Sequence, residues 1–217
     1  MMADKKSGVL IAFEGISGAG KGTQIRRLEH FLSSRKVEYV TTHWNSDPSV
    51  SPLIAQWKSQ QCLSPLLWST SHAVDMLKRY IEVIEPALSS GMVVIADRYV
   101  PTALSRDLCR GVPEYYVRNL YSYVSKPDIL FYMDVDINTA YQRRISRYPN
   151  MGHYSSGQDF LNVDNIEMSW KKYSALQQKI YNSVQDEFNF VFIDANKSVD
   201  TVWGTIREKL RNILEIE

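Results

Sequence analysis

Short apolar runs alternate along the chain with stretches in which apolar residues recur at helical spacing. Four runs are apolar on successive residues and each ends at a polar residue; they cover residues 8–14, 92–98, 128–135 and 188–195. A more polar run over residues 37–43 predicts a fifth strand. Runs of this kind are typical of strands covered on both faces, as in a parallel sheet between helices.

Helical patterns fill the intervals between these runs. They predict helices over residues 21–34, 65–90, 113–124, 137–147, 159–186 and 198–215. Because strand and helix alternate throughout, the pattern predicts a three-layer α/β fold, with a five-stranded parallel sheet between helices. Ligands of such sheets bind beyond the carboxyl ends of the strands, where Glu14, Asp97, Asp134 and Asp194 fall.

Composition narrows the class of protein. The 217 residues, 44% hydrophobic and 23% charged, predict a single domain over residues 1–217 with a sizeable core. A net charge of +1 argues against a nucleic-acid partner. Cys62 and Cys109 are far apart in no metal or disulfide spacing, which predicts free thiols and a cytoplasmic protein. No apolar stretch has the length of a signal peptide or membrane span.

The segment "GISGAGKGT" at residues 15–23 follows the first predicted strand and opens a predicted helix. Its glycines allow a tight turn in which successive N–H groups and the helix N-terminus converge on an anion, and Lys21 adds a mobile charge suited to the β- and γ-phosphates of a nucleotide. A glycine turn with a chance lysine is the structural alternative. The predicted phosphate-binding residues are Gly15, Ser17, Gly18, Ala19, Gly20, Lys21, Gly22 and Thr23. Because Gly22 replaces the usual Ser or Thr after the lysine, a hydroxyl for Mg²⁺ must come from Thr23 or be replaced by water.

Two further groups of charged residues suit phosphoryl transfer. Asp97 ends a predicted strand and could hold Mg²⁺, while Arg98 could clamp phosphate oxygens; otherwise Asp97 caps the strand and Arg98 lies on the surface. Arg143, Arg144 and Arg147 lie on adjacent turns of a helix that leads into a Pro/Asn/Gly-bearing loop. Arginines on a closing lid, predicted at about residues 143–158, would stabilise the transferring phosphate; a solvated basic helix face is the alternative.

These motifs together resemble the thymidylate kinase family of P-loop nucleoside-monophosphate kinases. The resemblance runs nearly end to end, through "IAFEGISGAGKGTQ", "LLWSTSHAVDM", "MVVIADRYVPTALSRDLCRG", "KPDILFYMDVDINTAYQRR" and "VFIDANKSVDTVWGTI". The P-loop is specific to the superfamily, whereas the ordered set with its spacings is specific to the family. The resemblance implies a homodimeric enzyme of nucleotide biosynthesis that uses ATP and Mg²⁺.

The resemblance also implies roles for particular residues. Catalytic roles would fall to Lys21, Asp97, Arg98, Arg143 and Arg147. Thr23 and Asp97 would serve Mg²⁺, and Asn196 and Lys197 would flank the adenine of ATP. Acceptor contacts would come from Trp68, His72, Arg98, Arg106 and Arg110. Trp68 would stack on the acceptor base, although its helical spacing equally fits a core tryptophan.

The acceptor side departs from the family pattern at three places. Ser17 stands where the P-loop usually carries an aspartate, the segment 42–49 lacks the usual arginine, and His72 replaces another arginine. Arg106 and Arg110 follow the strand that ends at Asp97 and are the nearest candidates to compensate. The predicted function is ATP-dependent phosphorylation of a nucleoside monophosphate, first of all dTMP to dTDP. A kinase for another small acceptor and an inactive ATP-binding regulatory module are the alternatives.

Overall fold

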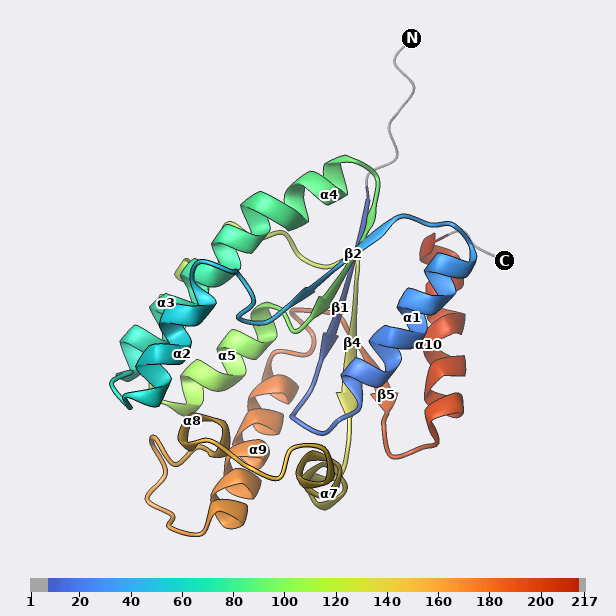
Figure 1. Ribbon diagram of the computed structural model, residues 1–217. Coiled ribbons are helices and arrows are strands. Elements are labelled where there is room, and N and C mark those ends of the chain that lie inside the picture. The colour runs from blue at the N-terminus through green and yellow to red at the C-terminus, as the bar shows by residue number, and fades with distance from the viewer. Residues whose placement is uncertain (1–7, 215–217) are drawn as a thin grey trace.

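The computed structural model describes residues 8–214, which fold around one parallel sheet (Figure 1). The strands lie in the order β2-β3-β1-β4-β5, so that β1 is central and leads to the P-loop. The strands are β1 (Val9–Glu14), β2 (Tyr39–His43), β3 (Val93–Asp97), β4 (Ile129–Asp134) and β5 (Phe190–Asp194). Their carboxyl ends therefore lie along one edge of the sheet, and the predicted three-layer α/β fold is confirmed.

Helices cover both faces of the sheet and its carboxyl edge. In Figure 1, α1 and α10 lie on one side, α3, α4 and α5 on the other, and α7 and α8 beyond the strand ends. The α-helices are α1 (Lys21–Ser34), α2 (Ser51–Ser59), α3 (Pro65–Arg79), α4 (Glu85–Ser89), α5 (Val100–Cys109), α6 (Glu114–Leu120), α7 (Ile137–Arg147), α8 (His153–Ser156), α9 (Ile166–Ser183) and α10 (Val199–Leu214). Among residues 8–214, no helix is both long and apolar enough to cross a membrane.

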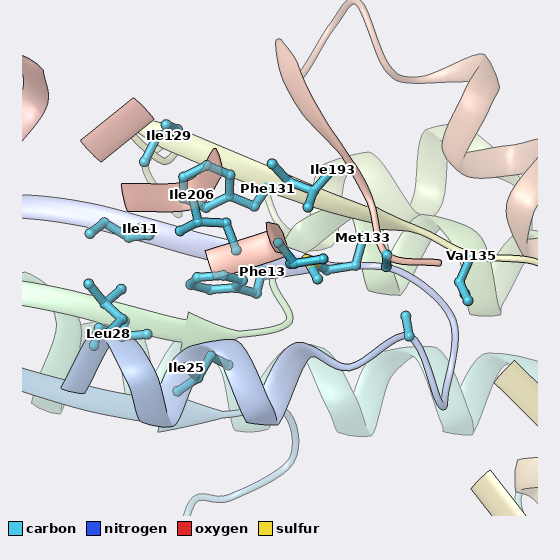
Figure 2. Packing of buried hydrophobic residues seen from close by; sticks show 14 of the residues in the cluster. Ile11, Phe13, Ile25, Leu28, Ile129, Phe131, Met133, Val135, Ile193 and Ile206 are labelled. Carbon is cyan, nitrogen blue, oxygen red and sulfur yellow. The ribbon is translucent and has the colours of Figure 1, made fainter. Parts of the chain in front are cut away.

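Two apolar clusters, one on each face of the sheet, hold the layers together. Alternate side chains of β1 divide between them: Ile11 and Phe13 pack with α1 and α10, while Leu10 and Ala12 pack with α3, α4 and α5. Figure 2 shows residues of the first cluster, in which Phe13 of β1 packs together with Ile25 and Leu28 of α1. Burial on both faces explains why the strands are apolar on successive residues.

The predicted helix over residues 65–90 is interrupted by a π-helical turn, η1 (Tyr80–Ile84). The Glu85 N–H donates to the Tyr80 carbonyl five residues earlier, and Pro86 follows within the first turn of α4. Proline has no N–H to donate to the carbonyl four residues earlier. The regular α-helical hydrogen bonding is therefore interrupted beside Pro86, where the π-helical turn occurs. The apolar periodicity continues through this turn, which is why the sequence pattern does not reveal it.

Other predicted boundaries also moved. The helix predicted over residues 159–186 begins at Ile166, because the Asn165 side chain accepts a hydrogen bond from the Met168 N–H at 2.9 Å and caps it. The helices α2, α5 and α8 fall outside the helices that the sequence pattern predicts. The N-terminal N–H groups of α5 are capped by Glu14, from a strand far away in the chain.

Candidate active site

The P-loop joins β1 to α1, and at two of its positions the backbone suits only glycine. Gly20 is the N-cap of α1 and has a φ of 94°. Gly18 has a φ of 83°, and a Cβ at that position would lie 2.1 Å from the Ala140 carbonyl oxygen of α7. Left-handed backbone and close approach both require a residue without a side chain. The loop therefore packs directly against the helix that carries the arginines of the predicted lid.

Lys21 is buried at the base of this loop. Its Nζ donates to the carbonyl oxygens of Gly15 and Ile16, both at 2.9 Å. Burial, together with the charge of Arg98, lowers the pKa of Lys21 to about 7, although Asp97 acts in the opposite direction. A polyphosphate bound in the loop would compete for this ammonium group and favour its charged form.

A cavity of about 750 Å³ opens in front of the P-loop. Its volume lies within the range of small-molecule sites. Among its lining residues are Ser17, Gly18, Ala19, Gly20, Lys21, Gly22, Thr23, His43, Asp97, Arg98, Arg143, Arg144, Arg147 and Lys197. The fold thus brings together the P-loop, the Asp-Arg pair, the three arginines of α7 and the turn after β5.

Two predicted nucleotide-site residues do not point freely into this cavity. Asn196 is absent from its lining, and its Oδ1 accepts a hydrogen bond from the Asp136 N–H at 3.0 Å. Arg143 lines the cavity, but its Nη1 donates to the Ala195 carbonyl at 2.8 Å. Both side chains therefore hold the turn after β5 against α7, Asn196 at its N-cap and Arg143 in its second half.

Asp97 lines the P-loop cavity, as does a second carboxylate, Glu29. His43, at the end of the neighbouring strand, places its Nδ1 3.8 Å from Asp97 Oδ2. Although burial works against it, the nearby His43 imidazole and the charges of Lys21 and Arg98 keep the pKa of Asp97 below its ordinary value. Asp97 and Thr23 line the same cavity, and no cluster of three or more His, Cys, Asp or Glu occurs within residues 8–214. A carboxylate and a hydroxyl suit Mg²⁺, which takes its remaining ligands from water and nucleotide phosphates.

Arg98 is held in a sharp turn directly after β3. Its φ is 76°, a conformation that non-glycine residues rarely adopt, and its Nη1 donates to the Gly15 carbonyl at 2.9 Å and to Thr102 Oγ1 at 3.2 Å. The turn is secured by Glu14, which accepts hydrogen bonds from the N–H groups of Tyr99 and Thr102. Backbone strain of this kind is maintained where the surroundings hold a functional residue in place.

A second cavity, of about 460 Å³, lies beside the first. The two share Ser17, Arg98 and Arg144 in their linings, so that they meet at these side chains. The second cavity is also lined by Lys58, Ser59, Trp68, Arg106, Gly152, His153, Tyr154, Ser155, Trp170, Tyr173 and Gln177. A basic junction between two adjoining cavities is the arrangement needed to pass a phosphoryl group from one ligand to another.

The two candidate compensating arginines differ in their surroundings. Arg106 lines the second cavity, and its guanidinium has no hydrogen-bond or ion-pair partner in the part of the chain described. Burial and the charge of Arg98 lower the pKa of Arg106, a cost that a bound anion would relieve.

Arg110, in contrast, lines neither cavity. All five of its N–H donors are engaged, with Asp159, the Tyr173 hydroxyl and the carbonyls of Arg106 and Tyr154. No donor is left for an acceptor phosphate, so we leave Arg110 out of the proposed acceptor site.

Trp68 and His72 form part of the wall behind the second cavity. Trp68 is 4% exposed, donates its Nε1–H to Asp107, and has the Arg110 guanidinium 4.2 Å from its ring centroid. Tyr154 stacks on it at 5.4 Å between centroids. His72 is buried outside the cavity lining. Trp68 thus has the packing of a core tryptophan as well as a place at the cavity, and stacking on a base stays a prediction.

Among the cavity residues that the sequence did not reveal is Lys58, and Arg144 received no role of its own. Lys58 lies in the unpredicted helix α2, so nothing in the local pattern placed it near the site. Arg144 belongs to the arginine cluster of α7, but the resemblance assigned roles only to its neighbours Arg143 and Arg147.

The fold and the paired cavities define a P-loop nucleoside-monophosphate kinase. The family model described as thymidylate kinase matches residues 13–206. A probable thymidylate kinase 2 from Saccharolobus solfataricus is 36% identical over 209 residues, covering 96% of this chain and 98% of the relative. A thymidylate kinase from Halothermothrix orenii is 24% identical and a probable thymidylate kinase from Thermococcus kodakarensis is 26% identical, each over 95% of this chain and 98% of the relative. The chain belongs to the thymidylate kinase family.

Proposed function

We propose that this protein transfers the γ-phosphoryl group of ATP to dTMP, yielding ADP and dTDP. The observation that carries the proposal is the meeting of two cavities at Ser17, Arg98 and Arg144. The P-loop cavity would hold ATP, and the second cavity would hold the monophosphate with its phosphate at the junction. The names of the relatives support dTMP as the acceptor.

The transfer needs positioning and charge rather than a strong base. A phosphate oxygen of dTMP attacks the γ-phosphorus, the bond to the β–γ bridging oxygen breaks, and ADP leaves with that oxygen. The P-loop N–H groups and Lys21 hold the β- and γ-phosphates, while Arg98 lies between donor and acceptor. Arg144 and Arg147, from the proposed lid at about residues 143–158, supply positive charge where the transferring group passes.

The acceptor phosphate would lie between Arg98 and Arg106. Both line the second cavity, and Arg106 has no competing partner in the described chain. These two side chains offer the positive charge that the segment 42–49 does not contain. Mg²⁺, held by Asp97 and Thr23, would supply positive charge to the phosphates of ATP.

Turnover of a panel of monophosphates tests the proposal. With ATP and Mg²⁺, we expect dTMP to have a kcat/KM higher than dUMP, dCMP, dGMP or dAMP in an assay coupled to ADP formation. Asp97→Asn should abolish turnover while ATP still binds, whereas Lys179→Met, an exposed change outside both cavities, should behave as wild type. ATP binding without turnover of any monophosphate would instead identify a regulatory module.

We also propose a homodimer that forms through the outer face of α3. This face exposes Leu66, Leu67, Val74 and Leu77, and it continues into η1 with the exposed Ile81. The opposite side of α3 carries Trp68 and His72, so pairing would support the acceptor wall from behind. Light scattering after gel filtration should give twice the chain mass, and the double substitution Val74→Lys and Leu77→Lys should give the single mass. A monomeric wild type at tens of micromolar would contradict the proposal.

A further inference from the structure

Lys58 and His72 form a contact between two helices at the wall of the second cavity. Lys58 Nζ lies 3.3 Å from His72 Nε2, and His72 Nδ1 lies 2.8 Å from the Trp68 carbonyl oxygen. A carbonyl oxygen only accepts hydrogen bonds, so Nδ1 carries the proton of the ring. Burial, with the charge of Lys58, keeps the pKa of His72 well below its ordinary value, so the ring is neutral. Nε2 is therefore an acceptor, and the Lys58 ammonium donates to it.

This contact orients the Lys58 side chain without cancelling its charge. Burial and the charges of Arg106 and Arg110 lower the pKa of Lys58 to about 8, so at pH 7 most of it is the ammonium form. Lys58 has no carboxylate partner in the part of the chain described, and the imidazole that holds it is neutral. Asp75 is the acidic group that acts on Lys58, but its oxygens accept from Arg79 and from the Asp47 N–H. An ammonium group has three donors, so two remain after the bond to His72.

The place of Lys58 decides which part of a ligand it meets. Lys58 lines the second cavity together with Ser59 and Trp68 but does not line the P-loop cavity. The junction of the cavities, at Arg98, must hold the reacting phosphate of the acceptor. On the proposed function, on which this inference rests, Lys58 therefore lies toward the opposite end of the acceptor, where the base would be.

We propose that Lys58 reads the edge of the acceptor base, selecting a ring carbonyl oxygen over an amino group, and that His72 is the positioning residue that presents it. This selectivity follows from the hydrogen-bonding groups that Lys58 and His72 present. The free N–H groups of Lys58 can bond only to an acceptor atom, and His72 has no lone pair left for a donor. Thymine and uracil present a carbonyl oxygen where cytosine presents an amino group, and two opposed donors would leave both without partners.

Discrimination between dTMP and dCMP tests this assignment. We expect Lys58→Met to lower kcat/KM for dTMP by about 10–100-fold and to leave the KM for ATP nearly unchanged. The kcat/KM for dCMP should be unchanged or raised, because the donor that opposes its amino group is gone. His72→Leu should have a smaller effect of the same kind, because Lys58 then loses its orientation. His72→Gln should retain most of the preference, since the amide oxygen can accept from Lys58. Lys179→Met is the matched control, and circular dichroism with the ATP KM reports whether each variant is folded.

The outcomes separate the inference from the proposed function. If Lys58→Met lowers kcat/KM equally for dTMP and dCMP, Lys58 binds the phosphate that both nucleotides carry. If kcat/KM for dTMP is unchanged, Lys58 does not recognise the acceptor. Either result overturns the inference and leaves the proposed function standing. A wild-type protein that phosphorylates neither nucleotide overturns the proposed function as well. If Lys58→Met fails to fold, Lys58→Gln takes its place. Its neutral amide can either donate or accept, so it should narrow the dTMP-to-dCMP preference, and an unchanged preference would again overturn the inference.

Discussion

Arg110 and Asp159 are joined by two hydrogen bonds, from Nε to Oδ2 at 2.6 Å and from Nη2 to Oδ1 at 3.0 Å. Both side chains are buried, with 1% and 8% of their surfaces exposed. The pair connects the end of α5 to the segment between α8 and α9, and Arg110 also donates to the Tyr154 carbonyl. Arg110 therefore holds one wall of the second cavity instead of a ligand in it.

Removing Arg110 should cost stability. Arg110→Met leaves Asp159 buried without its cation, so we expect the free energy of unfolding to fall by about 3–5 kcal/mol in urea denaturation. Arg118→Met is the matched control, because Arg118 pairs with Glu114 and Glu187 at the surface; it should cost about 1 kcal/mol or less. Unchanged stability with a raised KM for dTMP would return Arg110 to the acceptor site.

ATP binding should take up a proton at Lys21. In the free protein its pKa is about 7, mainly through burial and the charge of Arg98, so at pH 8 most of the population is neutral. Bound polyphosphate favours the charged form and raises this pKa, so the complex binds more protons than the free protein at pH 8. Calorimetry in buffers of different ionisation enthalpy should measure an uptake approaching one proton. Lys21→Arg stays charged throughout, and uptake that persists in this variant would assign the proton to another group.

Replacing Gly22 by serine should increase the apparent affinity for Mg²⁺ in turnover. A Cβ at Gly22 would lie 3.7 Å from Arg26 Nη1 and 4.0 Å from Arg147 Nη1, ordinary contact distances. Gly22→Ser therefore fits and adds a hydroxyl directly after Lys21. We expect it to lower the Mg²⁺ concentration that gives half-maximal rate several-fold, in a titration at fixed ATP. Thr23→Val should raise that concentration; if it does not, Thr23 does not serve the metal.

Substitutions of Arg143 and Arg144 in α7 should have different kinetic effects. Arg144 lines both cavities, whereas the Nη1 of Arg143 is bound to the Ala195 carbonyl. We expect Arg144→Met to lower kcat by about 100-fold, because it removes charge at the junction. Arg143→Met should mainly raise the KM for ATP by loosening the turn after β5. Steady-state kinetics with ATP and dTMP varied independently would decide; the reverse pattern would exchange the two roles.

The amino-acid sequence by itself determined the strands, the layers and the P-loop. Residues apolar on successive positions can be satisfied only by burial on both faces, and the glycine spacing around Lys21 specifies a turn with converging N–H groups whatever the rest of the chain does. These features depend on neighbours along the chain, so a pattern of residues is enough to predict them.

Only the tertiary structure decided the second cavity. The first turn of α5 is capped by Glu14, Lys58 is oriented by His72, and Arg106 differs from Arg110 only in what the fold places around it. Each of these relations joins side chains that are distant in sequence or lie on different elements. Hydrogen bonds and charges act through space, so whether an arginine binds a ligand or a buried carboxylate is settled by the packing of elements and not by the order of residues.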